Sequence, residues 1–267
     1  MKSIEQKNFK NKKVIVRVDF NVPLDENNNV TDSSRIKASL PTVNKLVSDG
    51  ASIILMSHLG RPKGIMGELS LKNILGDVER VFNQKIQFAE DILDPMTEIK
   101  IKNLKPKEII LLENLRFYKG EESGDYDFAK KLSSFAEFYV NDAFGTSHRA
   151  HASTTIIAQF FNNKKFSGIL LNKEVESIKK ILKNGKKPVL AILGGAKVSS
   201  KISVIKSLIQ FADDIIIGGG MAFTFVKSMG GLIGKSIFEE HKIEEAIKIV
   251  ELAKQKKVNL YFPTDVI

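Results

Sequence analysis

The run ASIILMS at residues 51–57 decides the fold class of this chain. It is almost continuously apolar, which is typical of a β-strand buried on both faces of a sheet. A helical stretch precedes it over about 41–49, with Pro41 as its expected first residue and Gly50 as its expected stop. A helix followed by a doubly buried strand predicts an α/β protein with a parallel sheet.

The same alternation extends in both directions from this run. In the first part of the chain, strands are predicted at 14–20, 51–57, 86–88, 109–114 and 137–142, and helices at 41–49, 71–83 and 125–136. After an amphipathic helix at 172–184, strands are predicted at 188–195, 214–220 and 258–263, and helices at 201–211, 221–229 and 239–257. Repeated strand–helix units predict doubly wound parallel sheets in two lobes.

The second array is expected to be incomplete, because it has three strands and its last strand lacks a covering helix. We therefore expect a first lobe at 1–170, a joining helix or hinge at 171–185, and a partial second lobe at 186–267.

Composition excludes several classes of protein. The 267 residues are 43% hydrophobic and 27% charged, which is ordinary for a globular protein. With Cys at 0, disulfide scaffolds, thiolate metal sites and cysteine nucleophiles are excluded. No apolar run reaches the ~18 residues of a membrane span, and the N-terminal residues lack a signal-peptide pattern. We expect a cytoplasmic protein with no membrane partner.

The charge balance favours anionic ligands. The formal net charge is +10, from 41 Lys and Arg against 31 Asp and Glu. Only six of these cations are arginines: Arg17, Arg35, Arg61, Arg80, Arg116 and Arg149. In a chain that uses lysine for most positive charge, arginine is expected where a planar, bidentate donor is needed. Arg17 lies inside a predicted strand and Arg80 inside a predicted helix, so a structural role is favoured for these two.

Three of the remaining four arginines, and three of the four histidines, follow predicted strands. Ligands of open α/β sheets bind beyond the carboxyl ends of the strands. The polar residues found there are Asp19, Asn21, His58, Arg61, Arg116, Asn141, Asp142, His148, Arg149 and His151, and Arg35 is expected just ahead of the first helix. His148 and His151 could equally cap their loop. This cluster predicts a pocket for a small polyanion, because arginine binds phosphate and carboxylate with bidentate geometry.

The second array carries glycines where its strands end. Gly194 and Gly195 follow one strand, and residues 218–220, all glycine, follow the next. Such turns let backbone N–H groups approach a phosphate closely. Lys197 and Lys201 would share one helical face if a helix began at Lys197.

Seven segments make the chain recognisable. They are VDFNVP (18–23), DSSRIKASLP (32–41), SHLGRP (57–62), ENLRF (113–117), NDAFGTSHRAHAS (141–153), LGGAKVSSKI (193–202) and GGGMAFTF (218–225). In this order, from about residue 8 to the end, they strongly resemble the phosphoglycerate kinase family. The resemblance implies two Rossmann-like lobes, one for 3-phosphoglycerate or 1,3-bisphosphoglycerate and one for ADP or ATP with Mg²⁺.

The resemblance also implies roles for individual residues. The triose site would consist of Asp19, Asn21, Arg35, His58, Arg61, Arg116 and Arg149. Nucleotide contacts would come from Gly194, Lys201, Gly218, Gly219 and Gly220, and the catalytic charges from Arg35 and Lys197. Members of the family are longer, and their magnesium ligand is expected in the segment that this chain lacks. A monomer is expected, as is the family's glycolytic reaction, and the alternative is a catalytically impaired fragment that binds only the triose.

The residues disfavour two other functions. A dinucleotide-dependent dehydrogenase would share the α/β lobes, but the chain has no G-x-G-x-x-G fingerprint. A nucleic-acid-binding protein fits the net charge, but the lysines are scattered and no nucleic-acid motif is present. GGLIGKS at 230–236 is not a phosphate-binding loop of the Walker type, because Met229 stands where its first glycine belongs.

Overall fold

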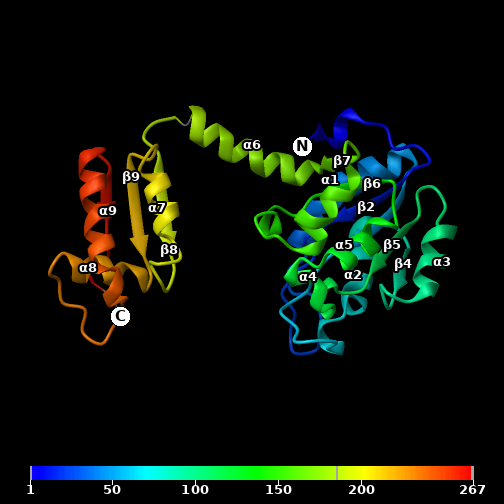
Figure 1. Ribbon diagram of the computed structural model, residues 1–267, viewed down its shortest axis with the longest axis horizontal. Coiled ribbons are helices and arrows are strands. Elements are labelled where there is room, and N and C mark those ends of the chain that lie inside the picture. Colours follow the sequence, from blue (N-terminus) through cyan, green and yellow to red (C-terminus); the bar gives the residue numbers. More distant parts are fainter. Residues whose placement is uncertain (1, 185, 266–267) are drawn as a thin grey trace. The chain divides into compact units, whose positions relative to one another are not determined.

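The computed structural model describes residues 2–184 and 186–265, which form two compact units (Figure 1). The units are Met1–Glu176 and Ser177–Ile267. The division falls inside helix α6 (Ile169–Asn184), within the segment 171–185 for which a hinge was expected. Residue 185 lies outside the described residues, and the hinge and the lobe limits stay predictions.

The first unit is built on a seven-stranded sheet in which every pairing is parallel. The strand order is β1-β7-β6-β2-β3-β5-β4. The strands are β1 (Lys2–Ser3), β2 (Lys13–Arg17), β3 (Ser52–Met56), β4 (Ile86–Ala89), β5 (Ile109–Leu112), β6 (Phe138–Asn141) and β7 (Lys165–Ser167). The predicted α/β class with parallel sheets is confirmed.

Alternate residues of the central strands pack on opposite faces of this sheet. Ile53 and Leu55 of β3 belong to one apolar cluster, which includes Leu46 of α1. Ile54 and Met56 belong to a second cluster on the other face. Both faces are therefore covered, which explains why 51–57 reads as a continuous apolar run rather than an alternating one.

Helices and short helical turns connect the strands of the first unit. The α-helices are α1 (Ser34–Asp49), α2 (Leu75–Phe82), α3 (Pro95–Asn103), α4 (Lys119–Ser123), α5 (Tyr126–Ser133) and the start of α6. The 3₁₀ turns are η1 (Ile4–Gln6), η2 (Gly67–Leu69), η3 (Leu71–Ile74), η4 (Leu115–Phe117), η5 (Phe144–Thr146) and η7 (Ile157–Phe161), and η6 (Ala152–Ile156) is one turn of π-helix. The helix α3 and the edge strands β1 and β7 were not predicted, because each is short or weakly patterned.

The predicted start of the first helix is wrong. α1 begins at Ser34, so Pro41 lies inside it and Arg35 lies in its first turn rather than ahead of it. A proline in a helix interior removes one backbone hydrogen bond. The buried side chains of Ile36 and Val43 lie on either side of Pro41. Burial of the helix face thus outweighs the cost of the proline, and it brings Arg35 onto a rigid element.

The second unit has a three-stranded parallel sheet in the order β10-β9-β8. Its elements are β8 (Leu190–Gly194), α7 (Ile202–Leu208), β9 (Asp214–Gly218), α8 (Met221–Ser228), η8 (Glu240–Lys242), α9 (Ile243–Gln255) and β10 (Asn259–Tyr261). Ile215 and Ile217 are buried in an apolar cluster with residues of these helices. The opposite face is open, since Ile192 is 72% and Ile216 is 37% exposed. The expectation of an incomplete second lobe is confirmed.

Candidate functional site

The predicted triose residues lie at one edge of the first sheet. The strands β6, β2, β3 and β5 are neighbours in that order, and all run parallel. Their carboxyl ends therefore meet at the same edge. Asp19 and Asn21 follow β2, His58 and Arg61 follow β3, Arg116 follows β5 in η4, and Arg149 follows β6. The topology thus gathers these residues at the edge where ligands of such sheets bind.

Asp19 holds Arg35 at this edge. The Nη1 of Arg35 forms an ion pair with Oδ2 of Asp19. The side chain of Arg35 is 52% exposed, so it remains available to a ligand. A hollow of about 410 Å³ adjoins the pair, and its lining also includes Asp142 and Glu174. Of the predicted triose residues, only Asp19 and Arg35 line that hollow.

The backbone of Gly60 is held from two sides by predicted site residues. Its N–H donates to Oδ1 of Asn21 at 2.8 Å, and its carbonyl accepts from Nη1 of Arg116 at 2.6 Å. Arg116 is buried and its Nε lies 3.1 Å from Oε1 of Glu122. These contacts fix the loop that follows β3. They therefore also fix the backbone position from which the Arg61 side chain extends.

Two arginines of the site are free to bind a ligand. Among the described residues of the first unit, no hydrogen bond or ion pair involves the side chain of Arg61 or Arg149. Arg61 is exposed and Arg149 is half-buried. A guanidinium with five N–H donors and no protein acceptor is well suited to a phosphate or carboxylate.

His58 is buried at the centre of the cationic cluster. Its pKa is lowered to about 2, first by burial and then by the charges of four guanidinium groups. These groups belong to Arg17, Arg116, Arg149 and Arg35. The effect of four cationic groups on this one pKa indicates that this region has excess positive charge, which favours an anionic ligand.

The other two histidines of this region differ from His58. His148 is exposed. His151 is buried, and its Nδ1 lies 3.8 Å from Oε1 of Glu121. Burial lowers the pKa of His151, and Glu121 opposes that effect.

In the second unit, the two predicted glycine turns touch each other. Gly194 and Gly218 are paired across β8 and β9. Gly219 has φ +69°, and a Cβ there would lie 2.9 Å from the carbonyl oxygen of Gly195. Close backbone packing thus explains glycine at 219. Gly194 has nothing within 4 Å of a Cβ position, so packing does not require glycine there and the space beside it is open.

The helix predicted at 201–211 begins close to its expected start, and it does not extend back to Lys197. α7 begins at Ile202, with Lys201 as its N-cap residue, so Lys197 and Lys201 do not share a helical face. The residues before α7 form turns, and a side chain from a distant segment of the second unit anchors them. Glu239 accepts from the N–H of Ser199 at 2.8 Å and from its Oγ at 2.7 Å. Lys197 is exposed in this segment.

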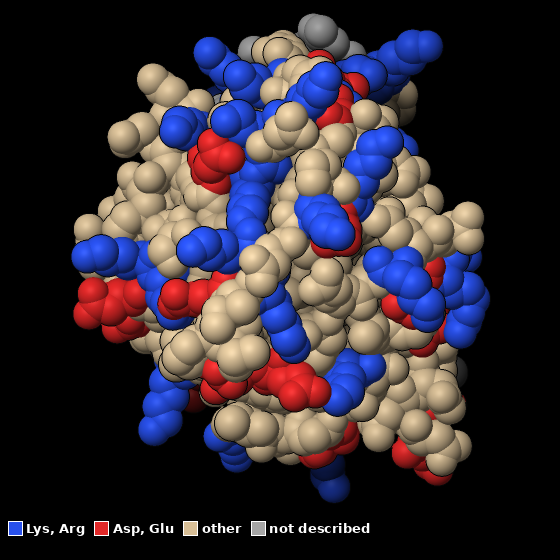
Figure 2. All heavy atoms as spheres, turned by 90° about the vertical axis from the view of Figure 1, so that its right-hand side faces the viewer, with Lys and Arg blue, Asp and Glu red and all other residues tan. Residues whose placement is uncertain are grey.

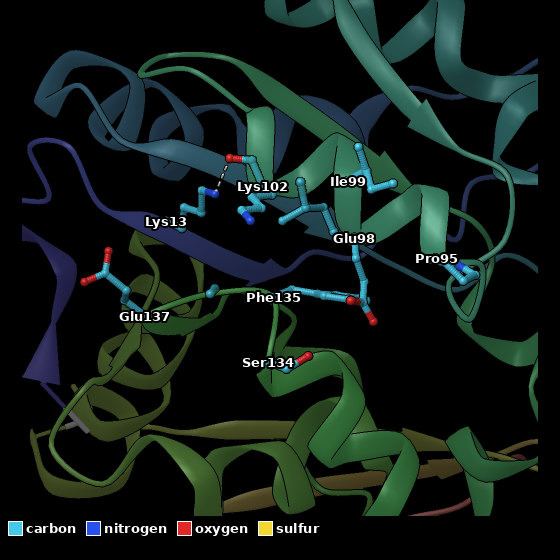
Figure 3. Close-up of a pocket in the computed structure, with 10 residues that line it drawn as sticks. Lys13, Pro95, Glu98, Ile99, Lys102, Ser134, Phe135 and Glu137 are labelled. Atoms are coloured by element: carbon cyan, nitrogen blue, oxygen red, sulfur yellow. Dashed lines mark hydrogen bonds between the residues drawn. The ribbon is translucent and has the colours of Figure 1, made fainter.

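A second hollow in the first unit, of about 600 Å³, is lined by residues from the opposite edge of the sheet (Figure 3). Lys13, at the start of β2, donates to the carbonyl of Lys102 at 2.8 Å across it. The carboxylates of Glu98 and Glu137 are paired with lysines outside the lining. Because these charges are already satisfied, the free guanidinium groups make the carboxyl edge the stronger candidate site.

Within the described residues, no three His, Asp or Glu side chains converge in a way that could hold a metal ion. This part of the chain therefore supplies no such cluster for the Mg²⁺ that the resemblance implies.

The sequence did not identify three buried residues behind the site as part of it. Arg17 is 1% exposed and bonds both His58 and Ser153, while Glu121 is 0% exposed and accepts from Ser153. One signal was present in the sequence: Arg17 stands within the apolar, β-branched strand predicted at 14–20, and an arginine that is buried requires a polar partner.

An arginine cluster at the strand ends of one parallel α/β unit, with glycine turns at the strand ends of another, is typical of α/β proteins that bind phosphorylated ligands. Comparison with known proteins gives the family. The family model for phosphoglycerate kinase matches residues 4–267. The chain therefore belongs to the phosphoglycerate kinase family, as the sequence resemblance predicted.

Relatives of known name agree with this assignment. The chain is 46% identical to the cytosolic phosphoglycerate kinase of Nicotiana tabacum over 265 residues, and 47% identical to the phosphoglycerate kinase of Dictyoglomus turgidum over 264 residues. Each match covers 99% of this chain and 66% of the relative. The structure of phosphoglycerate kinase from Coxiella burnetii matches with a TM-score of 0.82 and 37% identity, over 99% of this chain and 66% of that one. The chain thus spans slightly under two thirds of the length of these relatives.

Proposed function

We propose that this chain binds 3-phosphoglycerate at the carboxyl edge of the first sheet and takes part in reversible phosphoryl transfer between 1,3-bisphosphoglycerate and ADP. The observation that carries this proposal is the sheet topology, which brings Arg61, Arg116 and Arg149 to the edge where Asp19 pairs with Arg35 and where His58 is buried. Such a site suits a small ligand with a phosphate and a carboxylate or acyl phosphate. Its proposed members are Asp19, Asn21, Arg35, His58, Arg61, Arg116 and Arg149.

The chemistry of this reaction fits the residues. The attacking oxygen of ADP is already ionised at neutral pH, so no general base is needed. What remains is to position the reactants and to neutralise charge on the transferring group. Arg35 and Lys197 are the proposed sources of that charge. Asp19 would keep Arg35 in place until the ligand arrives.

The nucleotide is proposed to bind the glycine turns of the second unit. Gly194, Gly218, Gly219 and Gly220 would bring backbone N–H groups to the phosphates, with Lys201 beside them. The open space at Gly194 supports this assignment. Mg²⁺ would accompany ADP or ATP, but the described residues supply no cluster for it, and no step is derived through it.

Location and partners form a separate part of the proposal. Relatives include proteins named cytosolic and proteins named chloroplastic, and we propose a cytoplasmic, monomeric protein here. None of the helices described is long and apolar enough to cross a membrane. On the face shown in Figure 2, lysines and arginines are interspersed with acidic side chains, which does not favour a nucleic-acid partner.

Calorimetry with 3-phosphoglycerate, followed by an assay of ATP-dependent ADP formation, tests the proposed function. Binding with turnover supports the full proposal. Binding without turnover supports the alternative of a catalytically impaired chain that holds only the triose. If 3-phosphoglycerate does not bind, both proposals are wrong.

Arg35→Lys is expected to lower the rate of phosphoryl transfer about a hundredfold while changing the affinity for 3-phosphoglycerate much less. Lysine keeps the charge but loses the planar fork that can bond two oxygens at once. Rapid-quench measurement of the transfer step and calorimetry separate the two effects. Arg80→Lys is the matched control, since Arg80 lies on α2 and pairs with Asp77. An unchanged rate for Arg35→Lys would reject its catalytic role.

Sulfate is expected to compete with 3-phosphoglycerate, because the site has free guanidinium groups. Replacing Arg61 or Arg149 by alanine removes a cation with no protein partner, so the inhibition constant for sulfate should rise about tenfold. Arg80→Ala should leave it unchanged. Competition is measured by calorimetric titration of triose in increasing sulfate at constant ionic strength. Triose binding that is insensitive to sulfate would contradict a polyanion site.

A further inference from the structure

A buried hydrogen-bonded chain lies directly behind the candidate triose site. It begins at Glu121 of α4, passes through Ser153 of η6 and Arg17 at the end of β2, and reaches His58 after β3. All four side chains are buried. A buried cation and a buried anion are costly unless they are compensated, so their presence here calls for an explanation.

The contacts of Arg17 use the whole guanidinium fork. Nε donates to Oγ of Ser153 at 3.0 Å, Nη1 donates to the carbonyl of Val18, and Nη2 lies 3.0 Å from Nδ1 of His58. These three acceptors lie in different segments of the chain. A lysine has one donor centre and cannot reproduce this arrangement, which accounts for arginine at this position.

The contact with His58 determines the form of that histidine. Arginine has no acceptor atom, so Nδ1 of His58 must accept the hydrogen bond. The single proton of the neutral ring then resides on Nε2. Burial and the charges of Arg17, Arg116, Arg149 and Arg35 also hold the pKa of His58 far below its ordinary value.

Glu121 and Ser153 hold Arg17 in turn. The Oγ of Ser153 accepts from Arg17 and donates to Oε1 of Glu121 at 2.6 Å, while the Ser153 N–H donates to Oε2 at 3.0 Å. Ser153 lies in a single turn of π-helix, an element often found at functional sites. The serine hydroxyl therefore links the buried carboxylate to the buried guanidinium.

We propose that Arg17 is a positioning residue, which fixes His58 in its Nε2-protonated form as a hydrogen-bond donor to the triose, and that Glu121 acts through Ser153 to hold Arg17. The claim that the triose is the acceptor rests on the proposed function. The claim about the form of His58 does not, because it concerns the chain without ligand. The site would then combine charge from Arg35, Arg61, Arg116 and Arg149 with one directional neutral donor.

The test is nuclear magnetic resonance of ¹⁵N-labelled histidine, which is simple because the chain has 4 histidines. The signal of His58 is assigned as the one missing from His58→Asn. In the parent chain we expect one Nε2-protonated form that stays neutral down to about pH 4. In Arg17→Met we expect a mixture of both tautomers and titration above about pH 4, because the donor to Nδ1 and its charge are gone. Arg80→Met should match the parent.

A second variant covers the case in which Arg17→Met does not fold. Ser153→Ala keeps Arg17 but removes its link to Glu121, and we expect the minor tautomer of His58 to appear. Ser123→Ala, on the exposed side of α4, is its control. A purely structural role would lower the melting temperature and leave the tautomer unchanged. A single Nε2-protonated His58 in Ser153→Ala, or in folded Arg17→Met, would overturn the proposal.

The same samples separate this inference from the proposed function. Addition of 3-phosphoglycerate should shift the His58 signal of the parent, and the affinity should fall about tenfold in Arg17→Met, the loss expected for one hydrogen bond to a charged group. If the triose leaves the parent spectrum unchanged, the proposed function fails while the tautomer result still decides the role of Arg17.

Discussion

Replacing Glu121 by alanine is expected to lower the free energy of unfolding of the first unit by about 3–5 kcal/mol, the cost of leaving a buried charge uncompensated. Glu121 is 0% exposed and Arg17 is 1% exposed, and Ser153 links them. Burial lowers the pKa of Arg17, and the negative charge of Glu121 opposes this effect more than that of Asp19. Without Glu121, the cation stays buried and loses its main compensating charge.

Urea unfolding followed by tyrosine fluorescence measures this loss, because Tyr118, Tyr126 and Tyr139 lie in the first unit. Glu68→Ala, at an exposed glutamate, is the matched control and should change stability by less than about 0.5 kcal/mol. Adding Arg17→Met to Glu121→Ala removes the stranded charge. We therefore expect the double variant to be more stable than Glu121→Ala alone. If Glu121→Ala lowers the free energy of unfolding as little as the control does, Arg17 does not need this carboxylate to compensate its buried charge.

The strands of the fold could be predicted because their burial leaves a pattern in the sequence. Residues 51–57 read as a doubly buried strand, and β3 is covered on both faces. The helix α3 could not be predicted in the same way, since its exposed Met96 and Ile99 blur any apolar stripe. Pro41 suggested a helix start, but tertiary burial of the α1 face extended the helix seven residues further toward the N-terminus.

The residues of the candidate site were predictable for a different reason. A parallel sheet brings the ends of its strands to one edge, so position after a strand was enough to group Asp19, His58 and Arg116. Partners that come from irregular segments carry no such signal. Ser153 lies in a π-helical turn and Glu121 in a five-residue helix, and only the folded chain shows that they reach Arg17.

Asp142 is a buried residue directly after β6, and its carboxylate contacts the first turn of α6, the helix in which the two units divide. Its Oδ1 accepts from the N–H of Leu171 at 3.1 Å, and its backbone N–H donates to the carbonyl of Arg17 at 2.9 Å. Its Oδ2 has no hydrogen-bond partner within the part of the chain that the structure describes. Burial raises the pKa of Asp142 to about 6, against opposing hydrogen bonds from Thr42, Leu171 and Leu170.

Asp142→Asn is expected to remove a pH dependence of stability worth about 3 kcal/mol. The pKa of Asp142 in the folded chain lies above its value of about 4 in the unfolded chain. Its protonation therefore favours folding: that stability is fully present below about pH 4 and is lost as the pH rises through about 6. Asparagine does not titrate. The free energy of unfolding of the variant should therefore rise relative to that of the parent chain between about pH 4 and pH 8, as measured by urea unfolding across that range. Asp25→Asn is the control, because hydrogen bonds from Asn29 lower the pKa of Asp25, and its contribution is lost only at more acid pH. If the difference in free energy of unfolding between Asp142→Asn and the parent stays constant over this range, Asp142 is already ionised throughout it, with its unpaired oxygen satisfied by solvent.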